Sequence, residues 1–365
     1  MIRARAETGR LFALLSPDAL YERPVTDRHR LIFYLGHLEA FDWNMVARRG
    51  ANASAFHPTF DALFERGIDP EPGGAPVDCS ADWPSRETVE QYNSQTRDWI
   101  DRHWHHLDPT LLQMAIEHRY MHAETLANLM HDLPYSKKGH GPVRNHASAP
   151  APENSLRQHV GGSTRLGTPE GHFGWDNEFT AHEVTVAPFR MSKYKVTNGE
   201  YLRFVEEAGG TPSHFWRRQG DSWNYRGMFG EIPLPLDHPA WVTWNQAATF
   251  AAWRGLTLPT ESQFQLAATG HSHENGNFQH WDSVPVTESL VGNGWEWTRD
   301  VFAPFAGFSA HPAYAGYSAD FFDGKHYVLK GASPRTASLL IRQGFRNWYR
   351  PDYPHMYAGF HVVEN

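Results

Sequence analysis

The sequence predicts an α+β protein of two domains: a helical N-terminal domain over residues 1–134 and a C-terminal domain over 159–365, joined by a linker over 135–158. Three observations support this prediction. A chain of 365 residues is too long for one compact core. The first 134 residues contain long segments with helical periodicity, whereas short strand-like segments among Gly, Pro and Trp follow Val160. The residues between are polar, rich in Ala and Pro, and without periodicity.

The helices expected in the N-terminal domain begin and end at recognisable signals. They cover about Ile2 to Leu15, Asp27 to Arg49, Ser85 to Leu107 and Asp108 to Leu133. Ser85 and Asp108 are N-cap residues, Pro109 suits a first helical position, and Pro134 stops the last helix. Four helices of this length predict a bundle. The connection over 50–84 is long and rich in Pro and Gly, which is typical of a functional or mobile loop.

The C-terminal domain is expected to mix strands and helices. Strand-like segments occupy 182–191 and 326–332, and helical patterns occupy 198–209, 245–255 and 261–270. The chain has 14 Trp, 22 Phe and 14 Tyr, and the aromatic residues between these elements are expected to hold the irregular parts of this domain together.

The composition excludes several classes of protein. The single cysteine, Cys79, rules out a disulfide scaffold, a cysteine-based zinc site and an iron–sulfur cluster. The net charge of −8 lacks the basic excess of a nucleic-acid-binding domain. No apolar run approaches the ~18 residues of a membrane span, and no hydrophobic segment follows the N-terminus. We expect a soluble, cytoplasmic protein that binds neither nucleic acid nor membranes, and its 23 histidines leave cysteine-free metal sites open.

Three histidines form the sharpest chemical pattern. His118 and His122 are four residues apart and share a helical stripe with apolar residues, namely Leu111, Ala115 and Leu129. His37 lies beside Tyr34 and Leu38 in the second helix, so it is expected to face inward as well. Three neutral imidazoles from two helices hold one divalent ion on one side and leave the other side for exogenous ligands. The alternative is a chance pair of hydrogen-bonded core histidines. The cluster of His103, His105 and His106 is interpreted as mainly solvated.

Seven ordered blocks of the C-terminal domain form a second pattern. They are FGWDNEF (173–179), YKVTNGEYLRFVEEAGG (194–210), HPAWVTWNQAATFAAWRG (238–255), LPTE (258–261), NGWEWTRD (293–300), YSADFFDGKHYVLKGAS (317–333) and FRNWYRPDYPHMYAGF (345–360). With these blocks, the C-terminal domain resembles the C-type-lectin-like fold of the formylglycine-generating enzyme, the sulfatase-modifying factor. With His37, His118 and His122, the N-terminal domain resembles the DinB-like bundle that precedes this fold in the ergothioneine and selenoneine synthases, so the resemblance covers nearly the whole chain.

The resemblance implies an iron-dependent oxidative enzyme. Such enzymes bind one non-haem Fe(II) through three histidines, here His37, His118 and His122, and use O2 to join sulfur or selenium to imidazole C2 of Nα-trimethylhistidine (hercynine). Asn347 and Trp348 match the Asn-Trp pair that contacts the trimethylhistidine. A quaternary ammonium is suited by aromatic faces, which this chain supplies in number. The alternative interpretations are a turn-stabilising amide for Asn347 and a core aromatic for Trp348.

Several positions depart from the ergothioneine branch. Tyr349, a substrate-binding candidate, stands where that branch has an Asp that holds γ-glutamylcysteine. The loop over 65–83 contains only Arg66, although a donor with two carboxylates favours guanidinium forks. Met121 replaces a hydrogen-bonding Gln. Together with MHAETLANLMHDLP (121–134) and KGASPRTA (330–337), these differences favour a selenoneine synthase with a neutral selenosugar donor. The alternative is an ergothioneine-type sulfoxide synthase that uses a thiol, γ-glutamylcysteine or cysteine.

Other assignments stay open at this point. The ergothioneine enzymes use an active-site Tyr as a proton donor, and Tyr314 is the candidate here, with core packing as its alternative role. Formylglycine generation needs a cysteine pair in the C-terminal domain, and Cys79 lies outside that domain. A non-enzymatic lectin-like binding module and a zinc-dependent DinB-type thiol transferase are further alternatives, because a fold alone does not fix a function.

Overall fold

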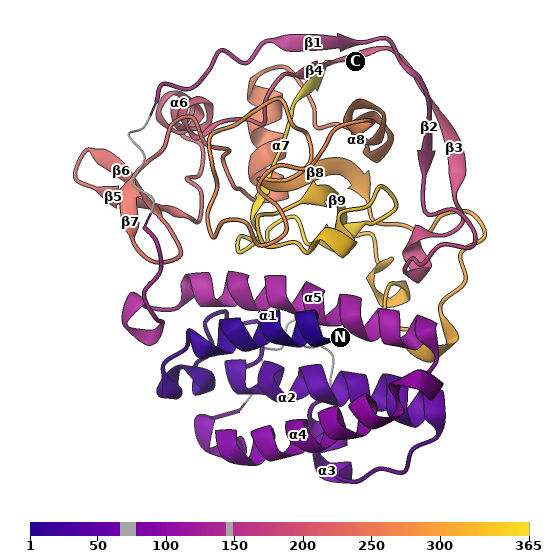
Figure 1. Cartoon of the computed structure of the whole chain (residues 1–365). Helices are drawn as coiled ribbons and strands as arrows, with labels where there is room; N and C mark the ends of the chain where they lie inside the picture. Colours follow the sequence, from indigo (N-terminus) through magenta and orange to yellow (C-terminus); the bar gives the residue numbers. More distant parts are fainter. Residues whose placement is uncertain (66–77, 144–148, 365) are drawn as a thin grey trace. The chain divides into compact units, whose positions relative to one another are not determined.

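The chain divides into two compact units, residues 1–141 and residues 142–365. A computed structural model describes residues 1–65, 78–143 and 149–364, and Figure 1 shows the course of the chain. The division between the units falls inside the segment 135–158 that the sequence predicts as a linker. That segment holds more regular structure than expected: it includes a 3-10 turn over Tyr135–Lys137 and the start of β1, Leu156–His159.

The first unit consists of helices. They are α1 (Ile2–Ala13), α2 (Leu31–Asp42), α3 (Pro58–Leu63), α4 (Arg86–His103) and α5 (Pro109–Asp132), with 3-10 turns over Pro17–Tyr21, Ser80–Asp82 and Trp104–His106. A π-helical segment, Trp43–Arg49, continues α2. Helix α1 packs against α5, and α2 packs against both α4 and α5 (Figure 1).

The capping residues anticipated for α4 and α5 are confirmed. The Ser85 side chain accepts a hydrogen bond from the Thr88 amide, and Asp108 accepts from the amides of Thr110 and Leu111. The start of α2 differs from the expectation, because this helix begins at Leu31 and not at Asp27.

Helix α2 is buried on every side, so it has no face exposed to water. All twelve residues from Leu31 to Asp42 are buried, which is the pattern of a central helix with neighbours all round. A further helix that the sequence pattern does not indicate is α3, which lies inside the long connection over 50–84. It begins at Pro58 after the N-cap His57, whose Nδ1 accepts from the Phe60 amide at 3.2 Å.

Within its described residues, the second unit mixes small sheets with three α-helices and several short 3-10 turns. Its helices are α6 (Asn198–Ala208), α7 (Trp244–Trp253) and α8 (Glu261–Ala268). Its strands are β1, β2 (Gly162–Leu166), β3 (His182–Val186), β4 (Phe189–Ser192), β5 (Trp216–Gln219), β6 (Ser222–Arg226), β7 (Glu231–Pro233), β8 (Gly294–Val301), β9 (Tyr327–Ala332), β10 (Asn347–Tyr349), β11 (Ala358–Gly359) and β12 (Val363–Glu364). All the strand-like and helical segments expected in this part of the chain correspond to these elements.

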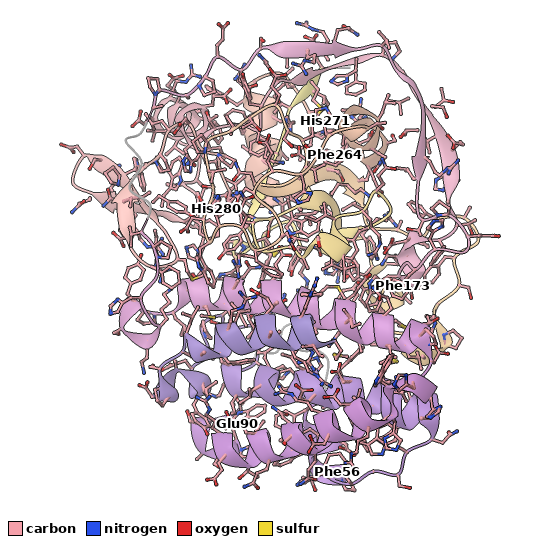
Figure 2. The ribbon with its side chains drawn as sticks, in the orientation of Figure 1. Phe56, Glu90, Phe173, Phe264, His271 and His280 are labelled. Atoms are coloured by element: carbon pink, nitrogen blue, oxygen red, sulfur yellow. The ribbon has the colours of Figure 1, made fainter. Side chains whose placement is uncertain are left out.

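The largest sheet has the strand order β10-β9-β8-β11. Strands β8 and β9 are antiparallel with a bulge between Trp297 and Val301, and Trp348 of β10 lies opposite Val328 of β9. The remaining sheets have the orders β1-β4-β12, β2-β3 and β5-β6-β7. Phe264 of α8, labelled in Figure 2, is buried in a core cluster with residues of β3 and β4.

Local sequence explains where the helices of the second unit begin. Each starts after a Thr whose side chain accepts from the amide three residues on, and the Glu or Gln at that position bonds back to the Thr amide; these N-caps are Thr197, Thr243 and Thr260. Among the described residues, no helix is both long and apolar enough to cross a membrane.

Candidate metal centre

The three predicted histidines converge inside the helical unit. The His122 Nε2 atom lies 3.2 Å from His37 Nε2 and 3.1 Å from His118 Nε2. Three nitrogens bound to one ion at about 2.1 Å lie about 3.0–3.4 Å apart, so both measured separations match a common ion. The three side chains are 1–4% exposed, which agrees with the inward direction expected from their helical stripe.

A backbone carbonyl fixes the direction of the His37 ring. His37 Nδ1 lies 2.6 Å from the carbonyl oxygen of Phe64, so Nδ1–H donates to that oxygen and the lone pair of Nε2 faces the other two histidines. Gly36 makes this approach possible, because a Cβ at this position would lie 2.6 Å from atoms of the Phe64 ring. Phe64 itself is fully buried.

Burial keeps all three imidazoles neutral. It lowers the pKa of His37 to about 4, with smaller contributions from the charges of His29 and Arg119. Burial also lowers the pKa values of His118 and His122 well below the usual value, helped by the mutual repulsion of the histidines. Only neutral imidazoles bind metal ions, so the three histidines are already in the protonation state that metal binding needs.

The donor set fits a divalent transition metal. Within the described residues, the Nδ1 atoms of His118 and His122 have no hydrogen-bond partner, so the only polar contacts of these two rings are those in the Nε2 cluster. Three lone pairs that meet at one point are stabilised by an ion that accepts all three. Iron, zinc and copper all bind imidazole, so the three histidines fit any of these metal ions and do not select one of them.

Aromatic rings enclose the histidine cluster. Phe41 stacks on His118 with ring centroids 3.5 Å apart, and Phe33 stacks on His37 at 4.9 Å. The Tyr34 ring lies 5.8 Å from that of His122. These three aromatic residues come from α2 and are buried, so they exclude water from this side of the site and hold the imidazole planes in place.

A buried ion-pair network connects the two helices that carry the ligands. Arg119 of α5 donates to Glu39 at 2.8 Å and to Asp42 at 2.5 Å, and Arg97 of α4 donates to Glu39 at 2.7 Å. Arg119, Glu39 and Asp42 are 0–1% exposed. Burial raises the pKa of Asp42 to about 6, and Arg119 opposes this rise. Burial also acts to raise the pKa of Glu39, but Arg119 and Arg97 hold it below its usual value.

Sequence reasoning missed Gly36, Phe64 and this network. In the sequence, Arg119 is only one of the residues between His118 and His122, and its burial depends on a partner helix. The histidine spacing could have prompted a search for a ligand-orienting group, but the carbonyl of Phe64 has no sequence signal because any residue type carries one. The prediction about Arg66 lies outside the described residues.

The substrate-binding candidates of the second unit lie on β10. Successive strand residues point to opposite faces, so Trp348 lies on one face and Asn347 and Tyr349 on the other. Trp348 stacks on Phe302 at 4.3 Å, whereas Tyr349 stacks on Tyr353 at 5.0 Å. The structure therefore does not bring these three side chains together on one face.

The proton-donor candidate, Tyr314, ends a short 3-10 turn, Pro312–Tyr314. Its ring lies 5.6 Å from that of Tyr317 and 6.5 Å from that of Trp175. The residue is half-buried at the edge of an aromatic cluster. Its role as a proton donor stays a prediction.

A family model described as the sulfatase-modifying factor enzyme 1-like domain matches residues 146–285 and 286–365, which is more than half of the chain. The chain belongs to this family. Its C-terminal unit is therefore the fold expected from the seven sequence blocks. The helical unit precedes the matched residues.

Two relatives are similar along almost all of the chain. The protein named ergothioneine biosynthesis protein 1 of Neurospora crassa is 26% identical and covers 96% of this chain and 56% of its own length. The hercynine oxygenase of Mycolicibacterium thermoresistibile is 25% identical and covers 91% of this chain and 86% of its own. The chain spans about half the length of the ergothioneine biosynthesis relatives that it matches. Among solved structures, PvdO from Pseudomonas aeruginosa covers 57% of this chain and 93% of its own, with 20% identity and a TM-score of 0.42.

Proposed function

We propose that this protein is a non-haem iron enzyme that uses O2 to form a carbon–chalcogen bond at imidazole C2 of hercynine. The observation that carries the proposal is the convergence of three neutral, buried histidine side chains from α2 and α5. The names of the relatives, an ergothioneine biosynthesis protein and a hercynine oxygenase, supply the substrate class. The helical unit is proposed to be a DinB-like bundle, which is the fold that the sequence resembles.

The residues of the chain have separate roles in this proposal. His37, His118 and His122 would hold the iron, which supplies the O2-dependent oxidation when bound. The Phe64 carbonyl keeps the lone pair of His37 directed at the site. The rings of Phe33 and Phe41 exclude water beside the ligands. Asn347, Trp348 and Tyr349 are proposed to contact hercynine, and Tyr314 is the candidate proton donor.

We propose a selenosugar as the chalcogen donor. The support is the sequence departure already described: Tyr349 replaces the Asp of the ergothioneine branch, and the loop over 65–83 lacks its arginine pair. A neutral donor needs neither group. The alternative donors are γ-glutamylcysteine and cysteine, with an ergothioneine-type sulfoxide as the product.

The formylglycine-generating reaction of the wider family is a poor alternative. That reaction needs a pair of reactive cysteines, and the chain contains one cysteine. Cys79 lies in the helical unit, beside a 3-10 turn over Ser80–Asp82, and its backbone amide donates to Asp82 at 2.6 Å.

The direct test is a competition between donors. The full chain is loaded with Fe(II) without oxygen, mixed with hercynine and with selenosugar, γ-glutamylcysteine and cysteine in parallel, and then exposed to O2. Mass spectrometry of the products is expected to show selenium on the imidazole. A sulfoxide formed preferentially from γ-glutamylcysteine would overturn the choice of donor. Turnover that persists after all metal is removed would overturn the enzyme class.

A further inference from the structure

Trp83 lies one aromatic ring away from a histidine of the candidate metal centre. Phe33 stacks on His37 with ring centroids 4.9 Å apart, and the Trp83 ring lies 6.1 Å from that of Phe33. A second route passes through Phe64, whose carbonyl oxygen lies 2.6 Å from His37 Nδ1 and whose ring lies 6.3 Å from that of Trp83. All these residues belong to the first unit. Two short chains of contacts therefore connect Trp83 with a metal ligand.

Trp83 is the outer end of both chains. Phe33 and Phe64 are fully buried, whereas Trp83 is half-buried. Trp83 follows the 3-10 turn Ser80–Asp82 and lies just before the start of α4. Small molecules in solution can therefore reach the indole of Trp83, although they cannot reach the two phenylalanine rings behind it.

A carboxylate holds the indole nitrogen of Trp83. Trp83 Nε1–H donates a hydrogen bond to Asp78 Oδ2. The other carboxylate oxygen of Asp78 pairs with Arg23, and Arg30 donates to the Asp78 backbone carbonyl at 3.0 Å. These two arginines keep Asp78 in position. A carboxylate oxygen in direct contact with the N–H stabilises a positive charge on the indole, because the opposite charges lie close together.

This arrangement suits the transfer of single electrons. Indole gives up an electron more readily than the ring of phenylalanine, and no bond has to break when it does so. Non-haem iron sites carry out one-electron chemistry with O2. We propose that Trp83 is an electron relay, which supplies an electron to the histidine site when O2 reacts there in the absence of hercynine. This inference rests on the proposed function.

The proposed step moves one electron and makes or breaks no bond. Trp83 loses the electron, which passes through Phe33 or Phe64 to the histidine site, where O2 is the oxidant. The Nε1 proton of Trp83 stays in its hydrogen bond with Asp78, so the indole remains as a radical cation. A thiol or ascorbate from solution then returns one electron to the half-buried ring.

The relay would protect the residues that hold the metal. Tyr34 is 0% exposed, and its ring lies 5.8 Å from that of His122, so reductants in solution cannot repair damage there. Oxidation that has no other outlet would fall on Tyr34 or on the histidines themselves. Oxidation that is passed on to Trp83 is reversible, because Trp83 is accessible to reductants.

The positions of oxidised residues test the proposal. The full chain is loaded with Fe(II) without oxygen and then exposed to O2 without hercynine, chalcogen donor or reductant. The protein is digested, and mass spectrometry locates the residues that have gained oxygen atoms. Trp104 is the internal control, because it belongs to the same unit and is 54% exposed, with its ring against His105. Oxidants that diffuse through solution would attack Trp104 before the half-buried Trp83.

We expect oxygen to be added at Trp83 and not at Trp104 in the unaltered chain, and ascorbate to suppress this addition. Trp104→Phe is expected to show the same pattern. His122→Ala, which removes a metal ligand, is expected to lose the oxidation of Trp83. In Trp83→Phe, oxidation is expected to move to Tyr34 and the histidines, so that iron is lost after fewer exposures to O2. The iron content of Trp83→Phe before the first exposure shows whether this variant is folded.

The unaltered chain alone can overturn the relay, so the test does not depend on the folding of a variant. If this chain binds iron but Trp104 or Tyr34 is oxidised in place of Trp83, the relay is wrong and the proposed function stands. The same conclusion follows if Trp83 is oxidised equally in His122→Ala. If the unaltered chain binds no iron, the proposed function and the relay both fail.

Discussion

Gly36→Ala is a sharp probe of the metal centre, because it adds a single methyl group against the ring of Phe64, the residue whose carbonyl orients His37. The new Cβ would lie 2.6 Å from three atoms of the Phe64 ring, which is well inside van der Waals contact. Phe64 is fully buried and packs against Phe60 and Trp83, with ring centroids 5.4 and 6.3 Å away, so its ring has little room to move aside. We therefore expect the whole Phe64 residue to shift, which disturbs the 2.6 Å hydrogen bond between its carbonyl oxygen and His37 Nδ1.

The expected magnitude follows from two opposing effects. Alanine in a helix interior is favoured over glycine by about 1 kcal/mol. Overpacking of a full core costs about 1–3 kcal/mol, so the crowding wins and we expect a net loss of about 1 kcal/mol in the free energy of unfolding. Loss of the group that orients a metal ligand reduces metal affinity about 10- to 100-fold, which is the larger and more specific effect.

The assay compares this variant with Gly9→Ala. Gly9 lies in α1, and no atom lies within 4 Å of the point that an alanine methyl group would occupy there. Alanine at this position is therefore expected to stabilise the protein by about 0.5–1 kcal/mol without changing metal binding. Fe(II) affinity is measured by chelator competition without oxygen, and stability by denaturant unfolding of the metal-free protein. An unchanged Fe(II) affinity in Gly36→Ala would refute the role of the Phe64 carbonyl.

Three further predictions concern stability. Arg119→Met leaves the buried Asp42 carboxylate without a cation and Glu39 with Arg97 alone, and it is expected to cost about 3–5 kcal/mol in denaturant unfolding; a loss below about 1 kcal/mol would contradict the network. Burial alone would raise the pKa of Glu296, but His361 and Lys195 hold it at about 2. The ionised Glu296 therefore contributes about 3 kcal/mol to the free energy of unfolding above pH 4.5, and this contribution is lost as the pH falls towards 2. Unfolding measured against pH should show this acid loss, and Glu296→Gln should flatten it. Thr197→Ala removes the hydroxyl oxygen that accepts from the Glu200 amide, whereas the bond from the Thr197 backbone amide to the Glu200 carboxylate stays. We expect a loss of about 1 kcal/mol in the free energy of unfolding, seen as a lower melting temperature; an unchanged melting temperature would argue against the cap.

Local signals in the sequence were enough for much of the fold. The starts of α4 and α5 could be predicted from Ser85 and Asp108, because an N-cap residue bonds to amides only two or three residues away. Periodicity was enough to direct His118 and His122 to one face, since a spacing of four residues has one geometry on a helix. The seven sequence blocks were enough to predict the fold family of the C-terminal unit, which the family model also matches.

The remaining features depend on contacts that are distant in sequence. Periodicity suggested an amphipathic α2, but the helix is buried all round because α4 and α5 both pack on it. The sequence alone gives no sign that Arg119 is buried, because its partners Glu39 and Asp42 belong to another helix. Asp176 is buried, and its Oδ2 has no hydrogen-bond partner among the described residues; this is a property of packing and not of spacing, so the sequence does not show it.

The most direct test of the central claim is the iron content of histidine variants. The full chain, reconstituted with Fe(II) without oxygen and freed of loosely bound metal, is analysed for bound iron per chain. We expect about one iron per chain in the unaltered protein and in His106→Ala, which changes an exposed histidine outside the cluster. We expect little or no iron in His37→Ala, His118→Ala and His122→Ala. Iron retained at the full level by His122→Ala, or absent from the unaltered protein, would contradict it.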